Sequence, residues 1–432
     1  MPLWYLLCNK HIVKFEFIIT IVTQKNLQSY IPALTGVRAL AAYLVFISHF
    51  EYVFDGNFPH AVQRFLQEFH MGVTIFFVLS GFLITYRYYN NFHLTKDWFK
   101  QYLKNRVARI YPMYFLLTVL AFVYYYVTHD EKITKGFPSV PGLLLMHVTF
   151  VRGFFANLWD TGIAQGWSLT VEECFYFSAP FVFLINKKYR QFYTQPLVLT
   201  GAGLLLVVIF RNVNWYGFFG NFTFTMIYTF LGRCFEFFVG IQLALILLNK
   251  GIERTNKIKY TYLGFLLMMV CVGIMSQLAI PKGWMAGLHN PFGIITNNYL
   301  LPPCIAMFFY GLLTESTVFK TILSFKFVEL LGKSSYIFYL IHLGYIRDFL
   351  NDWINKANDW IFEYYDAHGM SWEHSPFEND IINLIIQFVL LNALSILLFK
   401  TIEEPMNHYI RKSNFLIKNK PRNQENESAL IK

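Results

Sequence analysis

The sequence has few charged residues for its length. Asp, Glu, Lys and Arg make up 14% of the 432 residues, whereas hydrophobic residues make up 55%, with 47 Phe and 28 Tyr among them. Apolar runs recur from residue 31 to residue 402 and leave no interval for a large water-soluble domain. A run of about 20 mostly apolar residues can cross a bilayer. The sequence therefore predicts an all-α polytopic membrane protein with its helices in one bundle.

The sequence also lacks the features of a disulfide-rich or metal-binding protein, of a nucleic-acid-binding protein and of a chain with a cleaved signal peptide. The 5 cysteines show no CxxC spacing, which argues against a metal site or a disulfide framework. The net charge of +10 is spread between apolar runs instead of forming a basic patch, so no nucleic-acid partner is expected. Residues 1–29 mix Lys and Glu with apolar residues, unlike a cleaved signal peptide, and are predicted to form an amphipathic helix at the membrane surface.

The apolar runs predict about ten membrane-spanning helices. Their approximate bounds are 33–54, 71–89, 107–128, 167–186, 196–211, 224–248, 260–280, 293–314, 333–350 and 381–402. If both termini are cytoplasmic, the cytoplasmic segments hold 26 Lys and Arg residues and the outer loops hold 8. Basic residues favour the cytoplasmic side, so this count predicts ten spans with both termini in the cytoplasm.

Three segments are not expected to span the membrane. The apolar stretch 141–155 is too short for a span and is predicted to be re-entrant or interfacial. Residues 347–380 are predicted to be an acidic, aromatic-rich outer loop, and residues 406–432 a polar cytoplasmic tail. No internal repeat suggests a transporter built from two halves.

The first span carries an arginine, Arg38, and a histidine, His49. They are eleven positions apart, which places both on one face of a helix and separates them by roughly 16 Å along its axis. A charge at the bilayer centre costs about 2.5–3.5 kcal/mol on insertion scales, so such residues usually face a polar interior. Two interpretations stay open for this segment. Arg38 and His49 are a functional pair, or Arg38 reaches the cytoplasmic interface and His49 is a core residue whose hydrogen bonds are satisfied.

Two later motifs carry ionisable residues. Arg106 and Arg109 share a face at the cytoplasmic start of the third span, a pattern typical of phosphate binding and also of ordinary interfacial arginines. Glu172, in the motif GWSLTVEECFY, is a carboxylate in an otherwise apolar run. It could orient a His or accept a substrate hydroxyl.

The remaining polar positions allow a structural interpretation. Ser80 and Gly81 are two adjacent small residues, which allow another helix or a ligand to approach closely, and helix packing is the favoured interpretation. Arg233 and Glu236 are predicted to pair on one face of the sixth span for structural reasons. For the segment SSYIFYLIH, which ends at His342, packing and function are equally compatible with the sequence.

Taken in order, these segments resemble the acyltransferase-3 family of integral-membrane acyltransferases, which includes O-antigen acetyltransferases. LTGVRALAAYLVFISH is similar to the first-span motif of the family, GVTIFFVLSGFLIT to its second span, and RVARIYPMYF carries its Arg-x-x-Arg motif. WSLTVEECFYF, RCFEFFVG, LGKSSYIFYLIH and IEEP resemble later blocks. The resemblance covers residues 30–405, the predicted transmembrane domain. The segment before Tyr30 is longer and more apolar than expected, and no soluble hydrolase-like domain is appended, so a mechanism that uses such a domain is not expected.

The resemblance implies transfer of an acyl group, often acetyl, from cytoplasmic acyl-coenzyme A to a hydroxyl of a cell-surface or exported carbohydrate, in the bacterial inner membrane. It implies His49 as general base, since neutral imidazole is available near its ordinary pKa of about 6.5 and burial would preserve it. It implies Glu172 as a second catalytic residue, and Arg38, Arg106 and Arg109 as the residues that bind the acyl donor. The other residues expected to line the site are Ser80, Trp167, Ser168, Tyr336 and His342.

The donor thioester is already activated, so the resemblance implies acyl-coenzyme A as co-substrate and no tightly bound cofactor or metal. The expected partners are membrane lipids, this donor and a carbohydrate acceptor. An alternative from another class is a transporter or flippase of a lipid-linked sugar or acyl compound, because buried Arg, His and Glu suit transport as well. A non-catalytic membrane scaffold is a third interpretation.

Overall fold

A computed structural model describes residues 31–50, 53, 58–190, 192–253, 259–369 and 380–413. These residues form helices and no β-strand, as the sequence predicts. Seven helices in the described part are long and apolar enough to cross a membrane, and the chain is an integral membrane protein. The predicted surface helix 1–29 and residues 414–432 of the predicted tail lie outside the described residues.

Each predicted span overlaps a helix, and three of these helices have fewer than 18 residues. The seven candidate spans are His60–Tyr88, Lys96–Thr128, Gly166–Tyr189, Phe222–Lys250, Tyr260–Gln277, Pro291–Thr314 and Asp380–Lys412. Two further apolar helices, α2 (Pro32–Ser48) and α9 (Thr194–Phe210), have 17 residues each. The last, α16 (Lys326–Ile341), has 16. Residues 141–155 form the short helices α7 (Val140–Val148) and η2 (Val151–Phe154).

The predicted span 333–350 is wrong in its second half. Helix α16 ends at Ile341, and α17 (Tyr345–Ala367) begins after Gly344. The φ of Gly344 is 78°, a left-handed conformation that glycine adopts without steric cost. Helix α17 also fills most of the segment predicted as an outer loop. Its Asp and Asn residues interrupt the apolar ones, so the segment contains no long apolar run that would predict a helix.

The chain divides into two compact units, each made of two segments of the sequence. Unit 1 comprises Met1–Asn91 and Arg233–Ser335, and unit 2 comprises Phe92–Gly232 and Tyr336–Lys432. The two units are described separately.

In unit 1, helices approach one another closely at glycines. A Cβ atom at Gly72 of α5 (Met71–Tyr88) would lie 2.2 Å from the carbonyl oxygen of Ala41 in α2. A Cβ atom at Gly81 would lie 2.2 Å from the carbonyl oxygen of Phe237 in α11 (Phe230–Lys250). No larger residue fits at either position, and the predicted small-residue step beside Ser80 therefore brings two helices together.

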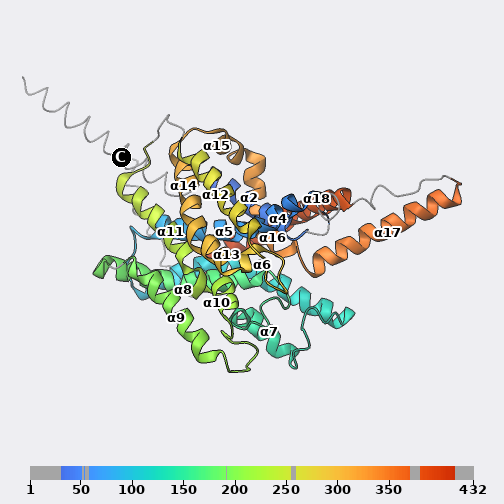
Figure 1. The fold of residues 1–432 in the computed structure, drawn as a ribbon, viewed down its shortest axis with the longest axis horizontal. Helices are drawn as coiled ribbons and strands as arrows, with labels where there is room; N and C mark the ends of the chain where they lie inside the picture. The colour runs from blue at the N-terminus through green and yellow to red at the C-terminus, as the bar shows by residue number, and fades with distance from the viewer. Residues whose placement is uncertain are drawn as a thin grey trace, which may run out of the picture. The chain divides into compact units, whose positions relative to one another are not determined.

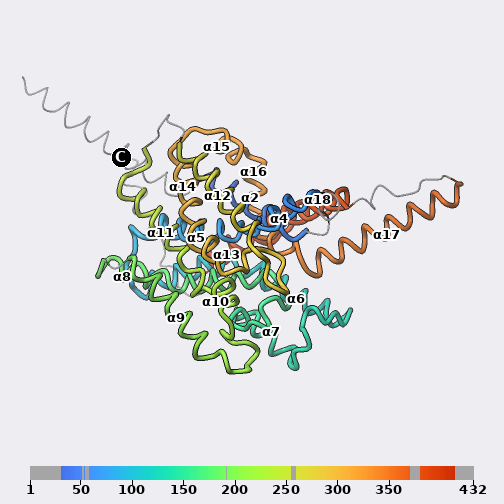
Figure 2. Tube along the Cα trace, viewed as in Figure 1, coloured from blue at the N-terminus to red at the C-terminus, as the bar shows by residue number. Residues whose placement is uncertain are grey.

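Helices α12 (Tyr260–Gln277) and α14 (Leu301–Thr314) run side by side in unit 1 (Figures 1 and 2). Directly after α14, the buried carboxylate of Glu315 accepts hydrogen bonds from the backbone N–H groups of Lys259, Tyr260 and Thr261, at 3.0, 2.6 and 3.0 Å. These N–H groups belong to the unsatisfied donors at the start of α12, where the helix dipole favours negative charge. Burial raises the pKa of Glu315, but these hydrogen bonds outweigh burial and lower it below its ordinary value.

We expect Glu315→Gln to lower the stability of unit 1 by about 1.5–3 kcal/mol, the usual contribution of hydrogen bonds to a charged group. Because the folded pKa is lower than the unfolded one, the stabilisation is complete above the unfolded pKa and is lost as pH falls through the folded pKa. Thermal unfolding in detergent from about pH 7 to about pH 3 should therefore show an acid-dependent loss that the variant lacks. The exposed Glu363 provides the control substitution. Identical pH profiles of wild type and Glu315→Gln would contradict a charged cap.

Unit 2 is organised around α6 (Lys96–Thr128) and α8 (Gly166–Tyr189), which contact one another. Helix α10 (Phe222–Tyr228) lies between α8 and α9 in contact with both. Helix α18 (Asp380–Leu398) continues into the π-helix η6 (Phe399–Glu403) and then α19 (Glu404–Lys412), and η6 and α19 pack on α6. The predicted polar tail therefore begins with residues of α19.

The chain on both sides of the break at Gly344 is fixed to α6. The hydroxyl of Tyr336 donates to the carbonyl oxygen of Ile110 at 2.9 Å, and the hydroxyl of Tyr345 donates to that of Leu117 at 2.9 Å. These bonds hold the residues around His342 against the middle of a candidate membrane span.

Candidate functional site

A polar stripe runs along one face of α8. Gln165, Ser168, Glu172 and Tyr176 recur at intervals of three or four residues, so they share a face over roughly 16 Å. Gln165, Ser168 and Tyr176 are buried, and the hydroxyl of Tyr176 donates to the carboxylate of Glu172. Polar residues inside a membrane span usually face a protein interior. The predicted residues Ser168 and Glu172 belong to this stripe.

The first half of the stripe is bonded to the segment that ends α16. Ser168 Oγ donates to the carbonyl oxygen of Gln165 at 2.9 Å. Its single proton is used there, so the hydroxyl of Tyr339, 2.8 Å away, must donate to Ser168 Oγ. Gln165 Nε2 also donates to the carbonyl oxygen of Leu343 at 3.4 Å.

The same segment orients the ring of His342. His342 is fully buried, and its Nδ1 lies 2.8 Å from the carbonyl oxygen of Tyr339. A carbonyl oxygen only accepts, so Nδ1 carries a proton, and in the neutral imidazole Nε2 is the proton acceptor. Tyr339 therefore links the other two residues: its hydroxyl bonds to Ser168 and its backbone carbonyl to His342. Tyr339 was not predicted.

Two arginines of α6 lie over tyrosine rings, and one of these rings belongs to the second half of the stripe. The Cζ atom of Arg106 is 5.4 Å from the centre of the Tyr176 ring. The Cζ atom of Arg109 is 5.9 Å from the centre of the Tyr336 ring, and its Nη1 forms an ion pair with Glu403. Such cation–π contacts restrain a guanidinium while leaving its N–H groups to bind elsewhere. The structure thus brings Arg106 and Glu172 to the same tyrosine and places Arg109 on Tyr336.

Trp167 faces a different neighbour. Its ring centre lies 4.8 Å from that of Tyr228 in α10, at an interplanar angle of 79°. The ring of Trp159 lies 4.2 Å from the same tyrosine. Trp167 is therefore part of an aromatic cluster between α8 and α10, and it is not bonded to the polar stripe.

The turn before α8 is organised by a buried arginine that was not predicted. Arg152 donates through Nη1 to the carbonyl oxygens of Leu158 and Trp159, at 3.3 and 2.5 Å, and through Nη2 to that of Ile163 at 2.5 Å. It is fully buried. These bonds shape the backbone that leads into Gln165, the first residue of the stripe. In the sequence, Arg152 is an unremarkable basic residue of a predicted outer loop.

His147 lies against the same turn. Thr161 Oγ1 donates to the carbonyl oxygen of Leu158 at 2.7 Å, so His147 Nε2, 3.2 Å from that hydroxyl, must carry the proton. Burial, and then the charge of Arg152, lower the pKa of His147 well below its ordinary value and keep the imidazole neutral. Its role in the structure is to pack the turn against α7.

Three of the predicted site residues lie in unit 1. Arg38 is half-buried in the middle of α2, and Ser80 is half-buried in α5. The expected burial of His49 is wrong: α2 ends at Ser48, before the predicted end of the span, and the side chain of His49 is exposed. The hydroxyl of Ser48 donates back to the carbonyl oxygen of Val45 at 2.7 Å. The convergence of Arg38 and His49 with Arg106 and Arg109 stays a prediction.

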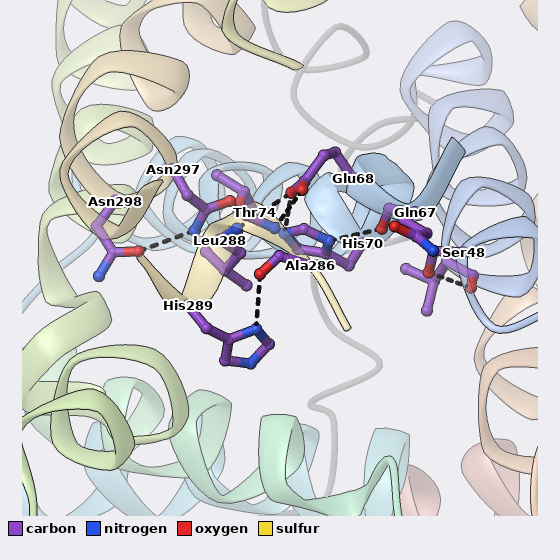
Figure 3. A network of polar contacts seen from close by, with 12 residues as sticks. Ser48, Gln67, Glu68, His70, Thr74, Ala286, Leu288, His289, Asn297 and Asn298 are labelled. Atoms are coloured by element: carbon purple, nitrogen blue, oxygen red, sulfur yellow. Dashed lines mark hydrogen bonds and ion pairs between the residues drawn. The ribbon is translucent and has the colours of Figure 1, made fainter. Parts of the chain in front are cut away.

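A polar network that the sequence did not reveal lies next to the end of α2. Helix α2 contacts η1 (Glu68–His70), and Ser48 appears in the network of Figure 3. The buried carboxylate of Glu68 accepts hydrogen bonds from the backbone N–H groups of Gly287 and Leu288, at 2.5 and 3.3 Å. His70 Nδ1 lies 3.0 Å from the carbonyl oxygen of Gln67, so it carries the proton, and Nε2 faces Glu68 at 3.7 Å. The network anchors the loop before α13 (Pro291–Ile295) to the start of α5.

The predicted pair Arg233–Glu236 is confirmed, with Nε 2.7 Å from the carboxylate. It forms one end of a longer buried chain of hydrogen bonds. Arg233 Nη2 donates to Thr74 Oγ1 at 3.0 Å, which donates to Asn297 Oδ1 at 3.0 Å. Asn297 then donates to Asn298 at 2.8 Å, and both asparagines lie in the π-helix η4 (Thr296–Leu300).

The two units thus differ in what they offer to chemistry. The unit 1 chain is fully buried and its members bond one another, which suits packing. Unit 2 contains the carboxylate of the stripe, the imidazole of His342 and the guanidiniums of Arg106 and Arg109, groups able to hold an anionic substrate and to move a proton. Among the described residues, no group of three or more His, Cys, Asp or Glu side chains could hold a metal ion.

Comparison with known proteins gives a match over most of the chain. The family model described as "Acyltransferase domain" matches residues 31–399. Among curated proteins, the chain is 24% identical over 337 residues to the putative peptidoglycan O-acetyltransferase YrhL of Bacillus subtilis, covering 72% of this chain and 48% of that protein. It is 25% identical over 325 residues to the O-acetyltransferase OatA of Staphylococcus aureus, covering 72% and 50%.

A third relative, the peptidoglycan O-acetyltransferase OatA of Listeria monocytogenes, is 30% identical over 200 residues, covering 43% of this chain and 29% of that protein. The chain spans about half the length of the first two relatives. No solved structure matches the chain.

Proposed function

Because the chain belongs to the acyltransferase-3 family of integral-membrane acyltransferases, we propose that it transfers an acetyl group to a hydroxyl of a cell-wall or other exported carbohydrate. The choice of acetyl as the acyl group and of a cell-wall carbohydrate as the acceptor rests on the names of the relatives, which are O-acetyltransferases and peptidoglycan O-acetyltransferases. The observation that carries the proposal is the polar stripe of α8, which lies inside the matched domain: it includes the carboxylate of Glu172, its Tyr176 lies under Arg106, and its Ser168 bonds to Tyr339, which also contacts His342.

The proposed donor is cytoplasmic acetyl-coenzyme A. Arg106 and Arg109 support this choice, because guanidiniums bind phosphate oxygens through paired N–H groups. Arg106 lies over Tyr176 of the stripe, and Arg109, one helical turn away, lies over Tyr336. The positive-inside count supports a cytoplasmic position for this end of α6. The proposed location is the bacterial inner membrane with both termini cytoplasmic.

In the proposed reaction, a general base takes the proton of the acceptor hydroxyl while its oxygen attacks the thioester carbonyl. The C–S bond then breaks, the thiolate of coenzyme A leaves and is protonated, and an ester remains on the acceptor. His49 is the base that the family resemblance assigns. His342 is the second imidazole to test, since its Nε2 is the proton acceptor of the neutral imidazole and Tyr339 links it to Ser168 of the stripe.

The test is transfer by the purified protein in liposomes. Acetyl-coenzyme A labelled in the acetyl group is supplied on one side and soluble peptidoglycan fragments on the other. We expect an alkali-labile acetyl ester on the glycan, detected by mass spectrometry, without any imposed ion gradient. Movement of the label or of glycan across the membrane without a covalent product would instead support the transporter alternative.

A further inference from the structure

Glu403 and Arg109 form a tightly held ion pair within unit 2. Arg109 Nη1 contacts Glu403 Oε1, and the side chains of Arg109 and Glu403 are 21% and 1% exposed. A carboxylate that is removed from water needs such direct pairing or hydrogen bonds to offset the loss of hydration. The buried member of the pair is therefore Glu403, and Arg109 is the member that reaches partly exposed surroundings.

The position of Glu403 depends on an irregular turn. Glu403 is the last residue of the π-helix η6, and the adjacent Glu404, which opens α19, is exposed. Short π-helical segments inside α-helices are frequent at functional sites. The two neighbouring glutamates thus have opposite surroundings, and only Glu403 contacts Arg109.

Two contacts fix the guanidinium of Arg109 and leave one edge of it open. Glu403 occupies Nη1, and the ring of Tyr336 lies under the guanidinium plane at 5.9 Å. The ring is itself held by the hydrogen bond from its hydroxyl to Ile110. Among the described residues, Nε and Nη2 of Arg109 make no hydrogen bond. These two N–H groups point the same way and form the fork that binds two oxygens of one phosphate.

We propose that Glu403 is a positioning residue that turns the Nε–Nη2 fork of Arg109 toward a phosphate group of the acyl donor. The inference rests on the proposed coenzyme A donor and adds the residue that prepares its binding. A guanidinium that a buried carboxylate and an aromatic ring already hold in place loses little conformational freedom when a phosphate binds. Glu403 therefore strengthens donor binding and takes no part in the chemical step.

The test compares Glu403→Ala, Glu403→Gln and the neighbouring control Glu404→Gln in the full-length protein in detergent. Binding of coenzyme A and of dephospho-coenzyme A is measured by calorimetry, and KM and kcat by acetyl transfer. We expect Glu403→Ala to raise Kd and KM roughly tenfold with kcat within about twofold of wild type, Glu403→Gln to give a smaller rise, and Glu404→Gln to change neither. A loss confined to coenzyme A assigns the fork to its 3′-phosphate, and an equal loss for both ligands assigns it to the pyrophosphate.

An exchange of the pair, Arg109→Glu with Glu403→Arg, separates positioning from stability. We expect the exchange to restore the thermal stability lost in Glu403→Ala. It should not restore coenzyme A binding, because the guanidinium then belongs to residue 403, on the buried side of the pair, and not to residue 109. Wild-type Kd and KM in Glu403→Ala, together with weakened binding in Arg109→Ala, would overturn the proposal. Absence of coenzyme A binding by the wild-type protein would overturn the donor assignment itself, an outcome seen before any variant is made.

Discussion

Acetyl transfer should fall by a factor of about 10²–10⁴ when His49 is replaced by alanine, the usual contribution of a general base. The side chain is exposed and lies beyond the last residue of α2, so the substitution removes no core packing. The protein should therefore keep its thermal stability and its affinity for coenzyme A. Single-turnover transfer with labelled acetyl-coenzyme A measures the loss directly.

His60→Ala is the matched control, because His60 is also an exposed histidine of unit 1. It should leave transfer unchanged. Transfer at the wild-type rate by His49→Ala would remove His49 from the mechanism. A large loss in His342→Ala with normal coenzyme A binding would then favour His342, whose Nε2 is the proton acceptor of the neutral imidazole.

Arg106→Ala should raise the KM for acetyl-coenzyme A by roughly 10–150-fold, the equivalent of losing about 1.5–3 kcal/mol of hydrogen bonding to a charged group. Arg106 is buried and stacked over Tyr176, so its charge lies in surroundings of low dielectric where a phosphate is bound strongly. Arg106→Lys should recover only part of the affinity, because an ammonium group has the charge but not the planar fork. Calorimetric binding of coenzyme A checks both variants.

Lys100→Ala provides the control for Arg106, since Lys100 is an exposed basic residue of the same helix. The effect of Arg106→Ala should persist at high salt, whereas the contribution of an exposed charge is screened. An unchanged KM for Arg106→Ala would support the scaffold interpretation, in which this arginine has only a topological role.

The fold was predictable wherever a long apolar run forms a helix. Runs such as 107–128 and 381–402 coincide with helices because burial in a membrane requires every backbone group to bond within its own segment. The same criterion fails for α17, whose apolar residues are mixed with Asp and Asn, and at Gly344, where one backbone conformation ends a run that remains apolar in composition.

The candidate site was predictable where its residues recur on one helix face. Helical spacing alone joins Ser168 with Glu172 and Arg106 with Arg109. The partners of these residues come from distant segments: Tyr339 for Ser168, and Glu403 for Arg109. The motif IEEP contains two adjacent glutamates, and the sequence does not indicate which of them pairs with an arginine. Only the tertiary structure distinguishes them. The exposure of His49 could not be predicted either, because no glycine or proline marks the end of α2 at Ser48.

The π-helix η6 lets the IEEP motif tolerate a change of chain length. A π turn contains one residue more than an α turn, so a single deletion within it, for example of Lys400, lets the helix continue with regular pitch. Because the extra residue is absorbed within that one turn, the residues after the deletion still face α6. The same deletion in a regular stretch of helix would instead rotate every later residue by about 100°. Homologues that lack one residue in this turn therefore keep an equivalent glutamate, and their alignment with this chain needs a one-residue gap within the turn.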